Sequence, residues 1–464
     1  MIYKFKRLLL ALFLFLLVFV TIKEIAYGFI AYSQSTWVVQ WFGNFYESKI
    51  SINDKKAIGK DSCNAEQINL LINEDIIINH NYIIDSLWNN KTIEVKLKRL
   101  RHIIHLFYPN LISGYDPYLE IIMPKMDYDE CKIVHENKKI HAEVKLTGGQ
   151  LDHFNTSRRS LRVKSEKKIF NMNVFNLYHP KVRLGGIYEW LGHMLLENEG
   201  LIALKTGYLN VSINNKKKGL YFFQEHPSSN MLKNNHLSPG LLFRLCLRDS
   251  IGNRVTNYEE NNTKLTIEKY YDKSTLKTTI DFKKQKLILE KLLERFNKNE
   301  ISFDSLMSIK KLSKFSAIIN LINGYHGAVL GNCYFYLNPE TLLIEPIGRE
   351  FATNFYEPSW ELKFRSPYYL KEKSMKKDHV LSVLYPYGLD SVKLKNYEKF
   401  FIGDLKRISK TSYLDTIFSL YSEELLQRQY CLYEGDQSFK KFNPNLYYKN
   451  QKSIQNYIET INSE

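Results

Sequence analysis

The sequence is poor in cysteine and contains no zinc-cluster spacing. Its 464 residues include five cysteines, and none of them forms a C-x-x-C pair, which argues against a zinc cluster. Because the number is odd, at least one thiol is free in a monomer. Cys246 and Cys333 lie in apolar, strand-like runs and are expected in the core. Cys63 and Cys131 flank the first soluble region, and the sequence leaves a disulfide between them open, with Cys431 further along the chain.

Internal repeats, low-complexity tracts and nucleic-acid-binding signatures are also absent. The composition is 44% hydrophobic and 14% aromatic, so the chain can bury a sizeable core and is not disordered as a whole. The net charge of +16 indicates acidic partners such as phosphate-bearing ligands, anionic lipid or an anionic envelope polymer. Most lysines are spread along the chain as a solvated surface, and no nucleic-acid partner is expected.

The first 32 residues have the pattern of a membrane segment. Leu8–Ile22 carries no charge and follows a basic flank, but at 1.5 Å per residue it is about 22 Å long, short of the roughly 30 Å hydrocarbon core. Lys23 and Glu24 separate it from a second apolar run, Ile25–Tyr32. We expect a single-pass anchor over residues 1–32, with the following chain on the extracytoplasmic side. A cleaved signal peptide and a buried core helix are the alternatives, and no clean A-x-A site supports the former.

Residues 33–138 are expected to form a membrane-proximal, partly helical region. Ala65–Leu87 and Lys91–Tyr108 have apolar residues at helix-like spacing. No catalytic constellation occurs in this stretch.

The most informative stretch is a predicted hairpin near the middle of the chain. Cys333–Leu337 and Leu342–Ile347 are strand patterns joined by turn residues, so Asn332 before the hairpin and Glu350 after it should lie side by side. An amide and a carboxylate at that place suit a divalent cation and the phosphates it carries. A Gly-rich turn holding His326 comes shortly before.

Protein kinases show the same order of groups. There a catalytic Asp lies five residues before a metal-binding Asn, and a metal-binding Asp follows further on. Here Gly327 stands five residues before Asn332, so the catalytic Asp is absent from its expected place. His326 is the candidate proton acceptor, and a structural hydrogen-bonding role is the alternative.

Two strand patterns upstream could cover phosphates. His141–Leu146 alternates between apolar and polar residues, Gly148-Gly149 then breaks the pattern, and Ser160–Lys164 alternates again. If the apolar residues of the second run face the core, Arg162 and Lys164 share the opposite face. A strand, a Gly-bearing turn and a strand that displays Lys is one way to place a charge on phosphates, although most such turns are only turns.

Ile187–Glu199 is predicted to be a helix that ends at Gly200. Glu189, His193 and Glu197 recur every four residues on one face. One of these glutamates is a candidate ion-pair partner for Lys164. The alternative is a solvated polar face, and a metal site is a weaker third interpretation.

The next elements are a hairpin and a buried strand. Tyr208–Ile213 and Leu220–Glu225 predict the hairpin, and Leu242–Leu247 predicts the strand. Asn253–Asp281 is polar and is expected to be an inserted loop. From Lys284 onward, apart from the central hairpin, the pattern is mainly helical, so the chain changes from α/β to mostly α.

Several runs, in their order and spacing, resemble the kinase family named for spore coat protein H (CotH). They are Arg159–Lys164, Phe175–Arg183, Tyr188–His193, Glu199–Leu204, Gly219–Tyr221, Gln224–His226, Asn332, Phe335–Pro339 and Glu345–Gly348, with a weaker echo at Asn443–Leu446. The resemblance covers roughly Lys139–Glu459.

The resemblance implies an α+β, bilobal, atypical protein-kinase-like fold with a mainly helical C-terminal lobe. The N-lobe-like part would span residues 139–228 and the C-lobe-like part residues 229–464. The family includes kinases that transfer the ATP γ-phosphoryl group to Ser in proteins, with Mg²⁺ or Mn²⁺ as cofactor. A pseudokinase and a membrane-anchored envelope scaffold are the alternatives.

The resemblance also implies roles for individual residues. Gly148, Gly149, Arg162, Lys164, Glu189 and Glu225 would form the nucleotide site, with Asn332 and Glu350 on the metal and His326 as the base. Adenine would bind backbone groups of Gln224–Pro227, where a polar loop is the simpler interpretation.

The chain departs from the family pattern at its centre. Gly331 precedes Asn332 where relatives usually carry a His, and Arg349-Glu350 follows Gly348 where they carry an Asp. The extra methylene of Glu350 moves its carboxylate, and Mg²⁺ demands near-ideal geometry. Arg349 is expected either to touch phosphate or to neutralise Glu350.

Overall fold

The computed structural model describes residues 65–77, 80, 127–148, 153, 158–183, 186–249, 251–252, 254–255, 264–271, 280–328, 330, 332–351, 391–435 and 442–463. The predicted anchor over residues 1–32 and the helix expected at Lys91–Tyr108 lie outside these residues. Within them, no helix combines the length and apolar character that crossing a membrane requires.

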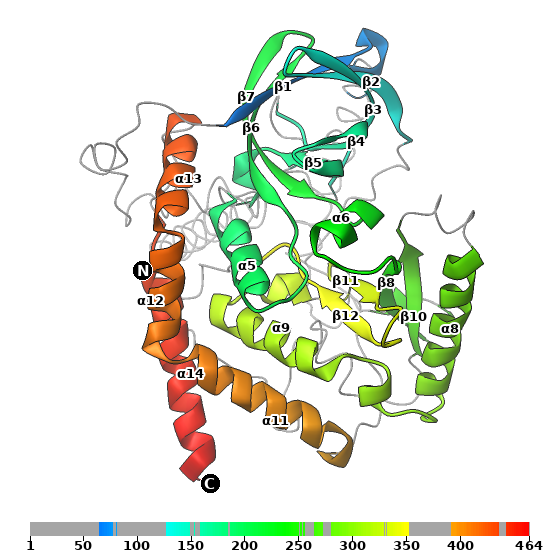
Figure 1. Ribbon diagram of the computed structural model, residues 1–464, viewed down its shortest axis with the longest axis vertical. Coiled ribbons are helices and arrows are strands. Elements are labelled where there is room, and N and C mark those ends of the chain that lie inside the picture. Colours follow the sequence, from blue (N-terminus) through cyan, green and yellow to red (C-terminus); the bar gives the residue numbers. More distant parts are fainter. Residues whose placement is uncertain are drawn as a thin grey trace, which may run out of the picture.

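The described chain is an α+β protein that begins with a closed seven-stranded β-barrel, in the order β1-β2-β3-β4-β5-β7-β6 (Figure 1). Parallel pairing of β1 with β6 closes the barrel, and the other neighbours are antiparallel. Alternate residues of each strand fill the interior, as Leu161 and Val163 of β4 show. The strands are β1 Glu66–Ile72, β2 Asp129–His135, β3 Lys138–Leu146, β4 Leu161–Ile169, β5 Met172–Tyr178, β6 Thr206–Ile213 and β7 Lys216–Glu225.

The first strand corrects one prediction. We expected Ala65–Leu87 to be helical, but Glu66–Ile72 is strand β1, with Ile68, Leu70 and Ile72 buried; within the described part of this stretch, residues 74–77 and 80 are helical. Ile68, Leu70 and Ile72 have a spacing of two, which the longer helix-like pattern around them obscured. With β2, this strand builds the barrel across the boundary that we predicted at residue 139.

Helix α5 (Ile187–Asn198) leaves the barrel after the short 3₁₀ helix η2 (Pro180–Arg183). Gly200 follows the C-cap of α5 with a positive φ, so the helix ends where the sequence predicted. Gly186, the N-cap residue of α5, also has a positive φ. Glu189 and His193 are 2% and 0% exposed, so the solvated polar face is wrong for these two residues. The hairpin that follows, β6 with β7, is confirmed, and Asn214 and Asn215 form its left-handed turn.

A smaller sheet with the strand order β10-β8-β11-β12 follows the barrel, with β9 pairing β8. Strand β10 lies inside Asn253–Asp281, which we expected to be a loop. It forms because Leu265 is buried opposite Leu247 of β8, although polar residues surround it in sequence. The strands are β8 Leu241–Arg248, β9 Arg254–Val255, β10 Lys264–Tyr270, β11 Tyr334–Leu337 and β12 Ile344–Ile347.

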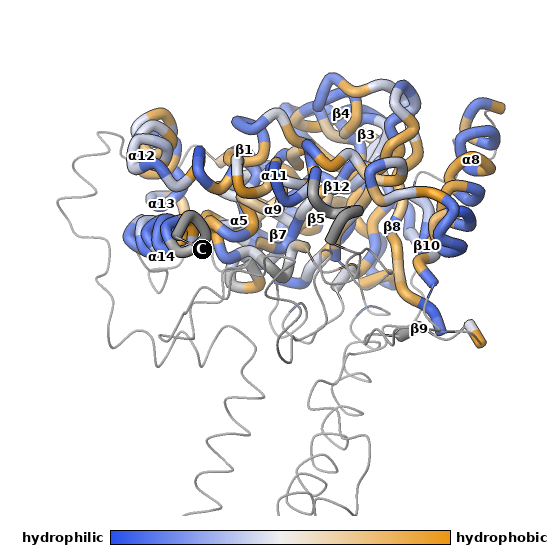
Figure 2. The backbone as a smooth tube through the Cα atoms, turned by 90° about the horizontal axis from the view of Figure 1, so that it is seen from below, coloured by the Kyte–Doolittle hydropathy of each residue, from blue (hydrophilic) through white to orange (hydrophobic). Residues whose placement is uncertain are grey.

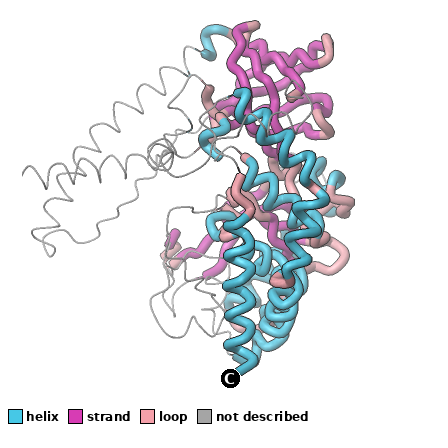
Figure 3. The backbone as a smooth tube through the Cα atoms, turned by 90° about the vertical axis from the view of Figure 1, so that its left-hand side faces the viewer, coloured by secondary structure: helices cyan, strands magenta, loops and turns pink. Residues whose placement is uncertain are grey.

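Helices make up most of the remaining described chain; most of them lie at the end away from the barrel, whereas α13 runs up beside it (Figures 1 and 3). Helix α9 is central and buried on most of its faces, with Phe315, Ile318 and Ile322 in the main core. Helix α8 alternates between hydrophilic and hydrophobic residues (Figure 2), and its buried side chains include Leu289 and Leu293. The helices are α6 Ser229–Asn234, α8 Ile280–Asn297, η3 Phe303–Ser305, α9 Ile309–Ile322, η4 Tyr325–Ala328, α11 Ser391–Ile408, α12 Thr411–Leu420, α13 Ser422–Gly435 and α14 Asn445–Ser463.

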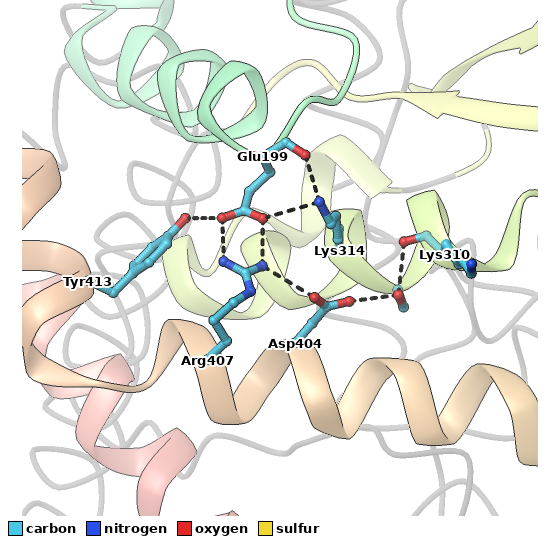
Figure 4. Close-up of polar contacts among 7 residues, drawn as sticks. Glu199, Lys310, Lys314, Asp404, Arg407 and Tyr413 are labelled. Atoms are coloured by element: carbon cyan, nitrogen blue, oxygen red, sulfur yellow. Dashed lines mark hydrogen bonds and ion pairs between the residues drawn. The ribbon is translucent and has the colours of Figure 1, made fainter.

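A charged network joins the end of α5 to the helices beneath it (Figure 4). The carboxylate of Glu199 accepts hydrogen bonds from both terminal nitrogens of Arg407, at 2.7 and 2.5 Å, and from the Tyr413 hydroxyl at 2.9 Å. Lys314 Nζ donates to the Glu199 backbone carbonyl at 3.0 Å. One buried carboxylate therefore ties together α5, α9, α11 and the first turns of α12.

The cysteines divide into free and oxidised residues. Cys131, Cys246 and Cys333 are free and buried, so a disulfide between Cys63 and Cys131 is wrong. Cys431 is disulfide-bonded.

Candidate functional site

The central hairpin brings Asn332 and Glu350 to the same end, as predicted. Strands β11 and β12 pair antiparallel, with Tyr334 opposite Ile347, so the residues before and after them meet. Arg349 Nε donates to the Asn332 carbonyl at 3.1 Å. Asn332 is half-buried and Glu350 is buried, with a positive φ of 60°.

The carboxylate of Glu350 is paired with an arginine. Arg349 Nη2 lies 2.8 Å from Glu350 Oε1, and both side chains are nearly buried, at 12% and 11% exposure. The guanidinium also lies 4.7 Å from the ring centroid of Tyr334. A positive group thus stands where we expected a divalent cation, and no cluster of three His, Cys, Asp or Glu side chains suited to a metal occurs in the described chain. This pair does not fit a Mg²⁺ site.

Helix α5 holds the segment that follows the hairpin. The Glu189 carboxylate accepts hydrogen bonds from the backbone N–H groups of Glu350 and Phe351, at 2.7 Å each, and from the Gln224 side chain. Gly192, one turn along α5, lets the Phe351 ring approach so closely that an added Cβ would lie 2.4 Å from it. Glu189 therefore anchors the backbone beside the candidate site.

Lys164 does not pair with this helix. On β4 it lies directly opposite Glu143 of β3, and the two side chains form an ion pair of 2.7 Å at the surface. Cross-strand neighbours of opposite charge pair readily, which explains why Lys164 selects Glu143. The predicted pairing of Lys164 with a glutamate of α5 is wrong.

Arg162 lies on the same face of β4 as Lys164 and is better placed than Lys164 to contact a phosphate. Its side chain donates to Asn176 Oδ1 at 2.8 Å and to Thr147 Oγ1 at 3.3 Å. The adjacent Gly148 has a φ of 124°, and a Cβ there would lie 2.2 Å from the His153 ring. Gly148 thus makes room for His153, and Gly149 lies outside the described residues.

The turn holding His326 is tightly packed. It forms the 3₁₀ helix η4 after α9 ends at Asn323, which has a positive φ of 55°. A Cβ on Gly327 would lie 2.4 Å from the Arg349 carbonyl oxygen. The fold leaves no space for an Asp at this position, and the His326 side chain lies outside what the structure describes.

The segment after β7 uses its own backbone donors. The N–H of Glu225 donates to the Lys205 carbonyl at 2.8 Å, and that of His226 to the Val174 carbonyl at 2.9 Å. An adenine predicted at this segment would find both donors occupied. The Glu225 carboxylate accepts from the Asn234 side chain at 2.8 Å, and burial raises the pKa of Glu225 to about 7.

His226 is buried beside two tyrosine rings and is influenced by several positive charges. It is 7% exposed, and its ring centroid lies 5.5 Å from that of Tyr271 and 6.1 Å from that of Tyr334. Burial lowers the pKa of His226 well below its usual value, and four nearby positive charges lower that pKa further. We call these four residues the basic cluster: Lys145, Arg162, Lys269 and Arg349.

Sequence reasoning missed two members of the basic cluster. Lys145 is opposite Arg162 across β3 and β4, and the alternation of His141–Leu146 placed it on that face. Lys269 lies on β10, inside the stretch expected to be a loop, with its Nζ 5.1 Å from the Tyr271 ring centroid. No local signal in the sequence links β10 to the barrel.

The arrangement is suited to binding an anion with phosphoryl groups. Barrel strands supply Lys145 and Arg162, strand β10 supplies Lys269, and the segment after β12 supplies Arg349, near a neutral imidazole and tyrosine rings. No protein-family model matches the chain, and a search of curated proteins finds no match either.

Proposed function

We propose that the chain is a kinase-like nucleotide-binding protein of the CotH type. The barrel with α5 would be the N-terminal lobe, and the second sheet with its helices the C-terminal lobe. The phosphates of ATP would bind at the basic cluster, between the two. The observation that carries this proposal is the hold of Glu189 on the backbone of Glu350 and Phe351. This contact places a helix glutamate beside the segment that follows the central hairpin. In kinases, a helix glutamate likewise lies near the bound phosphates.

Nucleotide binding without efficient transfer fits the site best. Gly327 has no space for a catalytic Asp, and Glu350 is neutralised by Arg349. Arg162 would contact phosphate through its guanidinium, a geometry that favours phosphate oxygens. Lys164 would contribute only long-range attraction, because its ammonium is paired with Glu143.

Transfer to a protein Ser or Thr hydroxyl is the second candidate. The four charges of the basic cluster favour it, because positive groups stabilise the charge on a transferred phosphoryl group. In that case His326 would accept the proton of the hydroxyl.

We also propose that the described chain lies outside the cytoplasm, held by an anchor over residues 1–32. The oxidised state of Cys431 supports an oxidising compartment. ATP is scarce there, which favours a binding role over rapid turnover. An anionic envelope polymer is the alternative ligand for the basic surface.

Nucleotide binding can be measured on the full-length chain in detergent. ATP should raise the melting temperature, since a ligand that binds only the folded state stabilises it. ATP should also bind more tightly than inorganic tripolyphosphate, because the adenosine adds contacts. A labelled-phosphate assay on the same sample separates transfer from binding.

Arg162→Gln should reduce the ATP shift, and Lys298→Gln, which removes an exposed charge at the end of α8, should leave it unchanged. No shift at millimolar ATP, together with salt-sensitive binding of an anionic polymer, would overturn the nucleotide proposal in favour of the scaffold.

A further inference from the structure

Two like charges face each other on the barrel. Lys145 of β3 and Arg162 of β4 are directly opposite in the strand register, and like charges in this arrangement are destabilising. The ammonium of Lys145 lies 4.4 Å from the Tyr128 ring centroid. Burial and the charge of Arg162 lower the pKa of Lys145, which the charge of Asp127 only partly offsets. An anion between the two side chains would relieve this repulsion.

A buried nitrogen of His226 lies among the same charges. Its Nδ1 has no hydrogen-bond partner among the residues that the structure describes. Buried polar atoms are nearly always hydrogen-bonded, so such an atom indicates a missing partner. In a neutral imidazole, the nitrogen that carries the hydrogen can donate a hydrogen bond to a phosphate oxygen.

The cation at this site is built into the chain. Arg349 bridges the backbone carbonyl of Asn332 and the carboxylate of Glu350, and that carboxylate is one of the two groups predicted to ligate a metal. Its guanidinium remains charged at any physiological pH and forms directed hydrogen bonds to phosphate oxygens.

We propose that the basic cluster binds the phosphoryl groups of a polyphosphate without a divalent cation, with Arg349 in the place of the metal. The inference rests on the proposed nucleotide function for the identity of the natural ligand, but it concerns the phosphates alone. Its chemical class is an inorganic or nucleoside polyphosphate that arrives free of Mg²⁺.

The test is calorimetric titration of the full-length chain with tripolyphosphate and with ATP, each in EDTA and in excess Mg²⁺. Binding should be at least as tight in EDTA, because Mg²⁺ neutralises part of the ligand charge. Arg162→Gln should weaken tripolyphosphate binding about tenfold or more, the usual effect of losing a charge-assisted hydrogen bond. Lys298→Gln is the matched control for net charge.

Two further variants identify the parts. His226→Phe keeps an aromatic ring beside Tyr271 and Tyr334 but removes the nitrogens, so it should weaken binding while the melting temperature is retained. Arg349→Gln should weaken binding in EDTA, because it removes a guanidinium charge from the basic cluster. If Arg349→Gln fails to fold, Arg162→Gln and His226→Phe still test whether the basic cluster binds the polyphosphate.

The outcomes separate this inference from the proposed function. Binding of ATP only in the presence of Mg²⁺ overturns the inference and leaves the nucleotide proposal standing. Equal binding of tripolyphosphate and ATP in EDTA supports the inference and contradicts a nucleotide-specific site. Absence of binding by both ligands under both conditions overturns both.

Discussion

The Glu189 carboxylate lies 2.7 Å from the backbone nitrogen of Glu350, although the two residues are 161 positions apart in the chain. The contact joins helix α5 to the end of the central hairpin. The Glu189 carboxylate accepts hydrogen bonds from backbone N–H groups rather than from a lysine side chain. It therefore orients the segment that carries Arg349 without depending on the charge of a side-chain partner.

Loss of this carboxylate should destabilise the protein. Glu189→Ala would leave the N–H groups of Glu350 and Phe351 buried without their acceptor, which typically costs about 1–3 kcal/mol for each group. We expect the free energy of unfolding in urea to fall by roughly 3 kcal/mol. Glu197→Ala, on the exposed end of the same helix, should change it by less than about 0.5 kcal/mol. Equal effects of the two substitutions would contradict the anchoring role.

Restoring an acid at the kinase position should not create a kinase. Gly327→Asp places a Cβ about where the Arg349 carbonyl oxygen already lies, at 2.4 Å. We expect a lower melting temperature and no gain in labelled-phosphate transfer. Gly327→Ala should also destabilise, whereas Gly403→Ala, in a helix with open space around it, should stabilise by about 0.5–1 kcal/mol. A gain of transfer in Gly327→Asp would show that this turn opens.

The network around Glu199 should be important for the packing of the helices (Figure 4). Glu199→Ala removes the acceptor for Arg407 and Tyr413 and leaves their groups partly buried. Breaking a buried pair from one side costs about 3–5 kcal/mol, and Arg407 is partly exposed, so the lower end of that range applies. Chemical denaturation measures the change. Glu294→Ala, which breaks the exposed pair with Lys298, should have little effect.

Glu225 should make stability depend on pH. Its pKa in the folded protein is raised from 4.5 to about 7 by burial, so the folded state holds a proton that the unfolded state releases. Its contribution to stability is therefore full below about pH 4.5 and is lost as pH rises through about 7, with a total of roughly 3 kcal/mol.

Urea unfolding of the wild type and of Glu225→Gln across this range isolates the effect. The difference between the two proteins is needed because the lowered pKa of His226 has the opposite sign, adding stability as pH rises toward its usual value. Parallel pH profiles for the two proteins would contradict the raised pKa of Glu225.

Local patterns in the sequence predicted many of the elements. The alternation in His141–Leu146, the turn chemistry of the central hairpin and Gly200 after α5 act through neighbouring residues, so their effects can be predicted without the fold. For the same reason, the meeting of Asn332 and Glu350 was predictable, because a short antiparallel hairpin brings its ends together.

Long-range pairing decided what the sequence could not. Glu66–Ile72 becomes a strand because β2 and β6 lie beside it, and β10 forms within a polar stretch because β8 offers it an edge. The partner of Lys164 is set by the register of β3 and β4 rather than by the helix expected to meet it. Tertiary context overrides local propensity at each of these places.

The chemistry of the candidate site also depends partly on the sequence and partly on the fold. The order of residues is enough to establish an Arg-Glu pair after the hairpin, a glycine in place of an acid, and an excess of positive charge. The tertiary structure sets the pairing of Arg349 with Glu350, the lack of room for a side chain at Gly327, and the influence of four distant cations on His226. Electrostatic interactions depend on distance and burial, and the fold sets both by joining residues that are far apart in the chain.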